Sequence, residues 1–249
     1  MAFITSASTA DDRLITGSTS EIGFEELVLD SQICVDALKL KRGVDQNNIF
    51  LLGHSEGALI AMLLAQKNNL AGIALVSPAG RPLDIIIEDQ LEHALSSAGY
   101  NQAQITAQIS EIQESIRYAK ENKPLTAKAP LPFLFGYKSA RWIREHLSNP
   151  PSKVAPTVKC PVAIFFGDKD FQLDVEKDGR ALAKSLILGG NDKVVFYPLE
   201  NVDHLMRVEP GVSTPIRYYD MSRPISEKFL QSLANWIVLT IKSKNKTYI

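Results

Sequence analysis

A serine between two glycines is the residue of this sequence whose setting best suits chemistry. Ser55 is the centre of Gly53-His54-Ser55-Glu56-Gly57, which matches the G-x-S-x-G pattern of a nucleophile elbow. A strand that turns directly into a helix holds the serine in a positive-φ conformation, so the residues two positions away must be very small. The turn exposes the hydroxyl and points the first N–H groups of the helix at an oxyanion. We predict Ser55 as a nucleophile and the Glu56 N–H as an oxyanion donor.

The surroundings of the elbow agree with this interpretation. The apolar run IFLL precedes it and ALIAMLLAQK follows it, which is the strand–turn–helix context that the motif requires. The alternative is a tight turn around an inert serine.

A serine hydroxyl is a weak nucleophile unless a base accepts its proton and an acid orients that base. The chain contains four histidines. His54 lies inside the elbow and is expected to point away from the hydroxyl, whereas His93 and His146 lie in helical patterns that favour surface or packing roles. His204 follows the apolar run at 194–197, on a loop at a carboxyl end of the kind where sites of α/β sheets gather. We predict His204 as the general base.

Three aspartates compete for the role of the orienting acid. Asp168, Asp170 and Asp174 lie in FFGDKDFQLD, directly after another apolar run. The chain order serine, aspartate, histidine is the one expected when a nucleophile elbow opens the site. The alternative for any one of the three is a turn of solvated carboxylates, and the pattern alone does not separate them.

The elements that must position these residues are short apolar strands. Their continuous apolar character, without alternation, is typical of parallel strands buried on both faces. The predicted strands are residues 49–52, 73–76, 162–166 and 194–197. One helix is expected from Phe24 to Leu38, and another begins near Pro224 with an apolar stripe that includes Leu230. Strands that alternate with helices predict an α/β fold with a wound parallel sheet.

Residues 80–158 do not show this alternation of strands and helices. Helical patterns at 84–97 and 102–122 precede a Pro-rich stretch and a short helix around Trp142. We predict a helical cap, inserted into a core formed by residues 1–79 and 159–249; the alternative is further core with weak strand signals. The apolar residues of the Pro-rich stretch either line an acyl pocket or pack on the sheet. They are Leu131, Phe133, Leu134, Phe135 and Tyr137.

Three segments together resemble the signatures of α/β-hydrolases, in particular capped bacterial esterases and serine-aminopeptidase-like hydrolases. They are residues 53–57, 167–170 and 201–204. The resemblance implies that Ser55 is the nucleophile, Asp170 the acid and His204 the base of a catalytic triad. It implies a serine hydrolase that cleaves a carboxylic ester, or less favourably a peptide-like amide, through an acyl-enzyme, without cofactor or metal. A hydrolase-like scaffold that binds a partner without catalysis is the second function considered.

The sequence before the elbow departs from the family pattern. Members of the family place several strands and an HG-rich oxyanion loop there, whereas 52 residues without a histidine precede Gly53. Only Asp12-Arg13 and residues 17–19 resemble a turn of that region. Loss of an oxyanion donor costs about 10²–10³ in turnover, so reduced activity is expected. We favour a truncated gene or a mis-called start; the alternatives are a degenerate paralogue and a sheet edge covered by a second copy in a homo-oligomer.

Composition excludes several function classes. The 249-residue chain has 27 basic and 28 acidic residues and a net charge of −1, which predicts no nucleic-acid partner. No apolar stretch reaches membrane-spanning length, and the first residues do not resemble a signal peptide. We therefore expect a cytoplasmic chain, provided that the N-terminus is complete. Cys34 and Cys160 form no CxxC pair and are expected in the apolar core rather than in a disulfide or zinc site.

Overall fold

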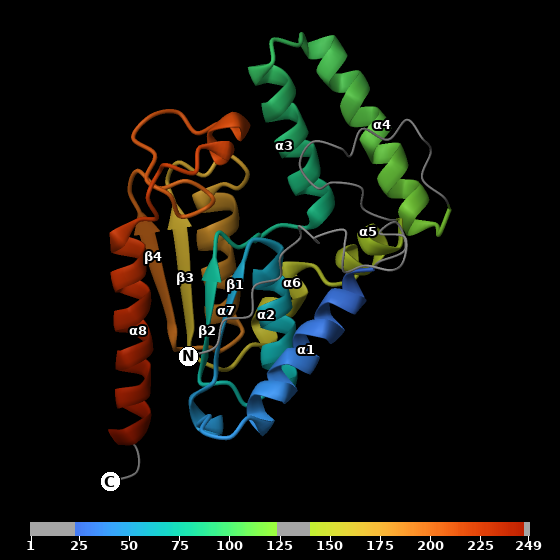
Figure 1. Ribbon diagram of the computed structural model, residues 1–249. Helices are drawn as coiled ribbons and strands as arrows, with labels where there is room; N and C mark the ends of the chain where they lie inside the picture. The colour runs from blue at the N-terminus through green and yellow to red at the C-terminus, as the bar shows by residue number, and fades with distance from the viewer. Residues whose placement is uncertain (1–22, 124–139, 247–249) are drawn as a thin grey trace. The chain divides into compact units, whose positions relative to one another are not determined.

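The computed structural model describes residues 23–123 and 140–246 and contains a four-stranded parallel sheet (Figure 1). The strands are adjacent in chain order, and each neighbouring pair is parallel. They are β1 (Phe50–His54), β2 (Gly72–Val76), β3 (Val162–Gly167) and β4 (Val194–Leu199). All four predicted strands are present, and the predicted α/β fold with a parallel sheet is confirmed. Because the strands share one direction, their carboxyl ends lie along one edge of the sheet.

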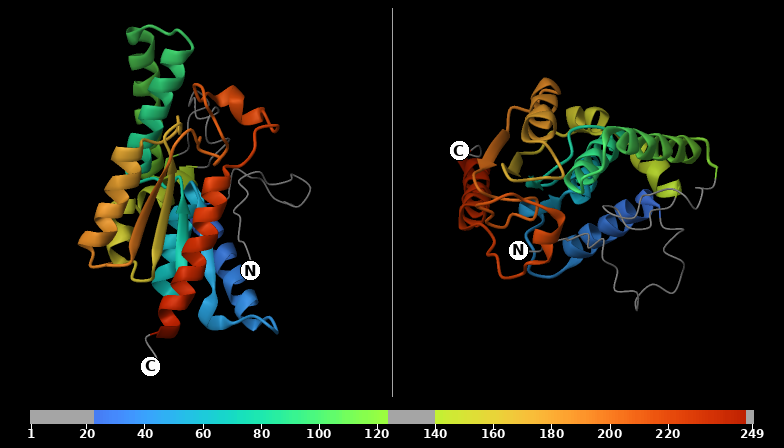
Figure 2. Two further views of the ribbon diagram at one scale, coloured as in Figure 1. Left: turned by 90° about the vertical axis from the view of Figure 1, so that its left-hand side faces the viewer. Right: turned by 90° about the horizontal axis from the view of Figure 1, so that it is seen from above.

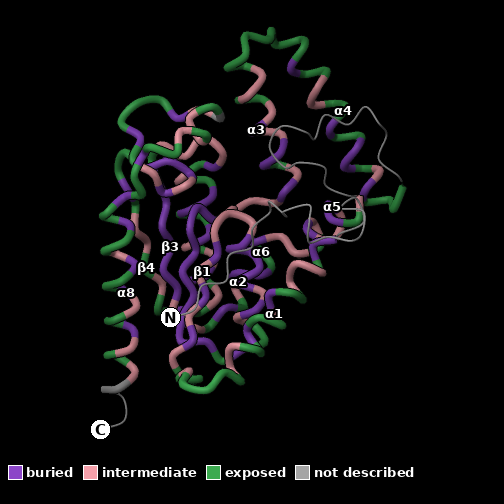
Figure 3. The backbone as a smooth tube through the Cα atoms, viewed as in Figure 1, coloured by how far each residue is buried: buried purple, intermediate pink, exposed green. Residues whose placement is uncertain are grey.

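Burial along the strands follows their position in the sheet. Every residue of β2 and β3 is buried, as their continuous apolar sequences predict. β4 is the last strand of the sheet and is only partly buried, with Val195 40% exposed. Figure 3 shows buried residues concentrated along the inner strands.

The chain divides into two compact units, and the sheet belongs entirely to the first. This unit contains Asp30–Gly80 and Pro151–Ile249, together with residues 1–6, which lie outside the described residues. Its helices are α2 (Glu56–Lys67), α6 (Pro151–Val154), α7 (Ala181–Leu188), α8 (Glu227–Lys246) and the greater part of α1 (Phe24–Leu40). Turns of 3₁₀ helix occupy Gln46–Asn48, Ala155–Thr157 and Pro215–Tyr219, and Val175–Arg180 is π-helical.

An aromatic cluster joins α8 to the sheet. Phe165 of β3 stacks on Tyr197 with ring centroids 4.8 Å apart and meets the edge of Phe229 at 5.2 Å. Trp236 of α8 contacts the ring of Phe50 edge-on at 5.6 Å. Figure 2 shows α8 along one face of the sheet, with α7 on the opposite face. Both faces are therefore covered by helices, as a buried parallel sheet requires.

Three details of the sequence prediction for this unit are wrong. The last helix begins at Glu227 rather than near Pro224, because the Ser226 hydroxyl accepts a hydrogen bond from the Phe229 N–H and caps the first turn. Leu230 is 49% exposed, although it was expected in the apolar stripe of that helix. Neither cysteine lies in the core. Cys34 is exposed, because the buried face of α1 runs through Ser31 and Val35, and Cys160 is half-buried.

The second unit is helical in its described part. It contains Ala7–Leu29 and Arg81–Pro150, and its helices are α3 (Leu83–Ser97), α4 (Gln102–Lys120), α5 (Ala140–Leu147) and the first turns of α1. α4 begins with a capping box, in which Asn101 and Gln104 exchange side-chain to backbone hydrogen bonds. Its predicted apolar stripe is buried at Ile105, Ile112 and Ile116.

The histidines of this unit lie where the sequence predicts. His146 is 6% exposed and packs between ring neighbours, with centroids 4.8 Å from Phe24 and 5.1 Å from Trp142. His93 is exposed.

The predicted acyl-pocket residues at 131–137 and the family-like turn at 12–19 lie outside the described residues. In the described part of the chain, every helix is too short or too polar to cross a lipid bilayer.

We expect Phe165→Ala to lower the free energy of unfolding by about 3–5 kcal/mol, because it removes a fully buried ring from the aromatic cluster. Val195→Ala, on the half-exposed side of β4, is the matched control and is expected to cost less than about 1 kcal/mol. Urea unfolding followed by circular dichroism measures both. Equal losses would contradict a core centred on Phe165.

Candidate active site

Ser55 occupies the turn that joins β1 to α2, in the strained conformation that the motif predicts. Its backbone angles are φ 53° and ψ −119°, a region that residues other than glycine adopt only when their surroundings impose it. The Ser55 N–H donates to the carbonyl of Val76 in β2 at 2.9 Å, and the Ser55 carbonyl accepts from the Ala58 N–H at 3.0 Å. Sheet pairing on one side and the first helical hydrogen bond on the other therefore hold the turn.

The glycine before the serine is required by a close approach of two backbones. A Cβ at Gly53 would lie 2.1 Å from the Gly57 carbonyl oxygen and 2.7 Å from the Ala58 Cα. Both atoms belong to the helix backbone and cannot move aside alone. The small residues of the elbow thus let β1 continue directly into α2.

A histidine and an aspartate from two other loops meet at the same edge of the sheet. The Nδ1–H of His204, after β4, donates to Oδ2 of Asp170, after β3, at 2.7 Å. The two side chains are 3% and 1% exposed. The second oxygen of Asp170 accepts N–H bonds from Gln172 at 2.9 Å and Leu173 at 3.1 Å. The carboxylate is therefore fixed from both sides, and it fixes the tautomer and orientation of the ring.

The other two candidate aspartates have different contacts. Asp168 is exposed, and its Oδ1 accepts a long hydrogen bond of 3.4 Å from the Val202 N–H. Asp174 caps the π-helical turn through N–H bonds of 2.8 Å from Glu176 and Lys177. Among the three, Asp170 is the partner of His204.

The loops that carry Asp170 and His204 also pack backbone against backbone. A Cβ at Gly167 would lie 2.1 Å from the Val202 carbonyl oxygen. That carbonyl accepts the Lys169 N–H at 2.9 Å, and the Leu199 carbonyl accepts the Asp168 N–H at 3.0 Å. The glycine at the end of β3 thus permits the contact that brings carboxylate and imidazole together.

The elbow is linked to the histidine loop by groups that sequence reasoning missed. The Nε2–H of His54 donates to the backbone carbonyl of His204 at 2.8 Å, and the two rings lie 4.8 Å apart. The Ser77 hydroxyl donates to the same carbonyl at 3.2 Å. Burial and the neighbouring His204 lower the pKa of His54 to about 4, so its ring is neutral at neutral pH. The position of His54 inside the elbow was a signal for this contact, whereas nothing in the sequence pointed to Ser77.

The structure brings Asp170 and His204 into direct contact. Ser55 lies next to His54, whose ring donates a hydrogen bond to the backbone carbonyl of His204. Among the hydrogen bonds of the described residues, none joins the Ser55 hydroxyl to the His204 ring. Such bonds are commonly long in free enzymes and tighten only when substrate binds.

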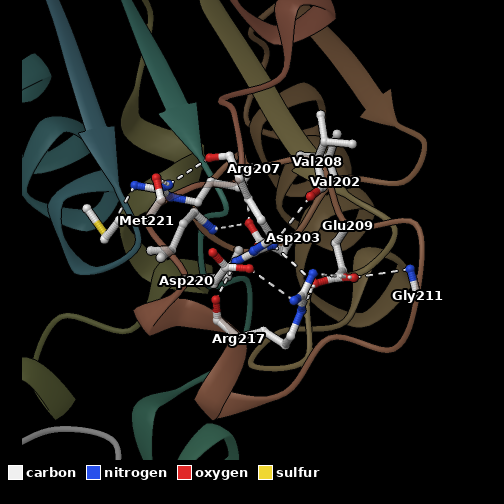
Figure 4. A network of polar contacts seen from close by, with 12 residues as sticks. Val202, Asp203, Arg207, Val208, Glu209, Gly211, Arg217, Asp220 and Met221 are labelled. Atoms are coloured by element: carbon white, nitrogen blue, oxygen red, sulfur yellow. Dashed lines mark hydrogen bonds and ion pairs between the residues drawn. The ribbon is translucent and has the colours of Figure 1, made fainter.

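A buried network of charges anchors the loop that carries His204 (Figure 4). Asp203 accepts N–H bonds of 2.9 Å from Leu205 and Arg207 on one oxygen, and its other oxygen lies 2.7 Å from Arg223. Arg223 also lies 3.2 Å from Glu209, and the side chains of Asp203, Arg223 and Glu209 are 0%, 6% and 2% exposed. Removal of one partner would leave a buried charge unpaired, which typically costs about 3–5 kcal/mol.

Further arginines extend this network to the surface. Arg217 donates to Glu209 at 2.9 Å and holds the pKa of that carboxyl below its usual value. Arg207 donates to the backbone carbonyls of Met221 at 3.2 Å and Arg223 at 2.7 Å. These residues are spaced irregularly along a loop, so no periodic pattern in the sequence indicates them.

An aromatic side chain from the same loop lies near the His204–Asp170 pair. The Tyr218 ring is stacked relative to the His204 ring with centroids 6.4 Å apart, and it meets Phe171 at 4.9 Å. Burial and the charge of Asp170 raise the pKa of Tyr218, so its hydroxyl stays protonated at neutral pH.

The described residues contain no group of three His, Cys, Asp or Glu side chains that could hold a metal ion.

Comparison with known proteins identifies a family for the chain. The model of a family described as "Serine aminopeptidase, S33" matches residues 17–198, about three quarters of the chain. The chain belongs to this family of α/β-hydrolases. The resemblance predicted from the three sequence segments is thereby confirmed.

One sequence relative and one solved structure show what this member of the serine aminopeptidase family is similar to. Esterase EstD of Thermotoga maritima is 27% identical over 216 residues, which are 85% of this chain and 49% of the esterase. The chain thus spans about half the length of that relative. The crystal structure of a Paleococcus ferrophilus monoacylglycerol lipase superposes with a TM-score of 0.51 at 16% identity, covering 90% of this chain and 78% of the lipase. This second likeness shows a shared fold.

Gly53→Ala is expected to lower the free energy of unfolding by about 1–3 kcal/mol or more, because the added methyl group overlaps the backbone of α2. At the control position, Gly211, a Cβ would meet nothing closer than a Glu209 oxygen at 3.4 Å. Gly211→Ala should therefore cost less than about 1 kcal/mol. Thermal unfolding compares the two, and a Gly53→Ala protein as stable as wild type would contradict the described turn.

His54 should make stability depend on pH. Its pKa is about 4 in the folded protein and 6.5 in the reference state, so the unfolded chain binds the proton first as pH falls. The stability due to the neutral ring is present above about pH 6.5 and is lost between pH 6.5 and 4, by up to roughly 3 kcal/mol. His54→Gln keeps a donor and cannot titrate, so its loss of stability over this window should be smaller. Urea unfolding at several pH values measures the free energy of unfolding, and the exposed His93→Gln is the control. If this free energy changes with pH identically in wild type and His54→Gln, titration of His54 does not affect stability.

Proposed function

We propose that this chain carries the catalytic triad of a serine esterase, with Ser55 as nucleophile, His204 as general base and Asp170 as orienting acid. One observation carries the proposal: the buried 2.7 Å hydrogen bond between Asp170 and His204 lies at the sheet edge where the strained Ser55 turn also ends. The family and the esterase relative support it.

The arrangement of hydrogen bonds assigns each group a step. Asp170 accepts the Nδ1–H of His204, which leaves the Nε2 lone pair free to take the Ser55 proton. Ser55 then attacks the ester carbonyl, and Asp170 stabilises the imidazolium that forms. His204 returns the proton to the leaving alcohol as the tetrahedral intermediate collapses to an acyl-enzyme. His204 next takes a proton from a water molecule whose oxygen attacks the acyl carbon. The bond between the acyl carbon and the Ser55 oxygen then breaks, His204 returns the proton to that oxygen, and the carboxylic acid is released.

The negative oxygen of the tetrahedral intermediate needs hydrogen-bond donors. We assign the backbone N–H of Glu56, at the first turn of α2, because it follows the nucleophile and lies at the positive end of the helix dipole. One donor of this kind contributes about 10²–10³ in turnover. We propose a small-molecule ester as substrate. The helical cap at 80–158 stays a prediction from the sequence. Cytoplasmic location and homo-oligomerisation stay predictions from the sequence.

A scaffold that binds without turnover is the second candidate function. It is favoured by the lack, among the described residues, of a direct hydrogen bond between the Ser55 hydroxyl and the His204 ring. In such a protein the Asp170–His204 pair would be structural, and Ser55 would not react with an electrophile.

A fluorophosphonate probe and a nitrophenyl ester distinguish the two functions. We expect the probe to label wild type and not Ser55→Ala, and Asp170→Asn to lower ester turnover by about 10³–10⁴ because the imidazole loses its correct tautomer. Asp168→Asn is the matched control, since it alters an exposed carboxylate of the same loop and keeps its acceptor oxygen; it should retain wild-type turnover. A folded wild type that neither labels nor turns over would favour the scaffold.

A further inference from the structure

The backbone carbonyl of His204 accepts two hydrogen bonds from side chains at the ends of two different strands. His54, the last residue of β1, donates through Nε2–H at 2.8 Å, and Ser77, directly after β2, donates through its hydroxyl at 3.2 Å. Ser77 is fully buried and has a φ of 42°. A carbonyl oxygen has two lone pairs, so these two donors satisfy it.

Backbone hydrogen bonds to the sheet hold the chain at both donors. The N–H of Ser77 donates to the Phe165 carbonyl at 2.8 Å, and the N–H of Ser55, next to His54, donates to Val76 at 2.9 Å. Their backbones thus continue the pairing of β1 with β2 and of β2 with β3. The peptide group of His204, although it lies on a loop, is therefore fixed relative to the sheet.

We propose that His54 and Ser77 are positioning residues that hold the backbone of His204 in register with the nucleophile elbow; this rests on the proposed roles of Ser55 and His204. Asp170 orients the imidazole ring through Nδ1, and the two donors hold the peptide group that carries it. Because His54 and Ser55 are consecutive, a shift of the elbow moves the donor and the nucleophile together. A misplacement of about 1 Å in such a site can cost about 10²-fold in rate.

Two replacements of His54, by glutamine and by leucine, distinguish a positioning role from a packing role. The amide nitrogen of glutamine can take the place of the His54 Nε2 donor, whereas leucine fills the space without donating. The Ser77→Ala variant removes one hydroxyl and leaves the backbone unchanged. If His54 positions His204, kcat falls in His54→Leu and recovers in His54→Gln. If His54 only fills space, kcat falls by a similar factor in both variants.

The variants are tested by steady-state hydrolysis of a nitrophenyl ester and by circular dichroism. We expect kcat to fall about 10–10²-fold in His54→Leu and about 3–10-fold in Ser77→Ala, with KM nearly unchanged. His54→Gln should return to within about 3-fold of wild type. His93→Leu, an exposed histidine elsewhere, is the control. Wild-type kcat in folded His54→Leu and Ser77→Ala would overturn the proposal, and Ser77→Ala alone decides it if His54→Leu does not fold.

A spectroscopic readout keeps this inference separate from the proposed function. The buried Nδ1–H of His204, bonded to Asp170, is expected to give a low-field proton resonance by NMR. That resonance should be sharp in wild type and His54→Gln, and broadened by exchange with water in His54→Leu and Ser77→Ala. An inert wild type that shows this pattern would exclude the esterase and support the positioning. A resonance unchanged in all variants would overturn the positioning, whatever the activity.

Discussion

The parallel direction of the four strands is the constraint on which the candidate site depends. Because β1, β2, β3 and β4 all end at the same edge, residues separated by long stretches of sequence arrive beside one another without any specific attraction between them. The register completes the arrangement, since His54 is opposite Val76 and Gly167 is opposite Leu199. Each candidate functional residue then lies within a few positions of a strand end, where the sheet itself limits its movement.

Close backbone contacts at this edge require residues without side chains. Gly53 allows the helix after the elbow to begin against the strand before it, and Gly167 allows the aspartate loop to touch the histidine loop. The strain at Ser55 persists because hydrogen bonds to β2 and within α2 fix the residues around it. Two glycines and one strained serine therefore determine how closely the three loops converge.

The sequence predicted the parts of this protein that repeat or that carry a motif. Buried strands were recognisable because both of their faces are apolar, and His204 was recognisable from its place after the last of them. The choice of Asp170 over Asp168 and Asp174 followed only from resemblance, since all three lie in one polar loop. Cys34 was misplaced, because an apolar residue beside the buried stripe of an amphipathic helix looks much like one within it. No pattern in the sequence indicated the Asp203–Arg223–Glu209 network or Ser77, because side chains on irregular loops are positioned by tertiary contacts alone.

The hydrogen bonds that gather around His204 join residues that are remote along the chain. His54 and Ser77 lie 150 and 127 positions from the residue whose carbonyl they bind. Contacts of such sequence separation require long loops to close before they contribute to stability. A chain that has been synthesised only as far as Leu199 contains His54 and Ser77 but not the carbonyl that they bind. On the roles proposed above, Ser55 therefore has no base until residue 204 has been synthesised and has folded onto the sheet edge.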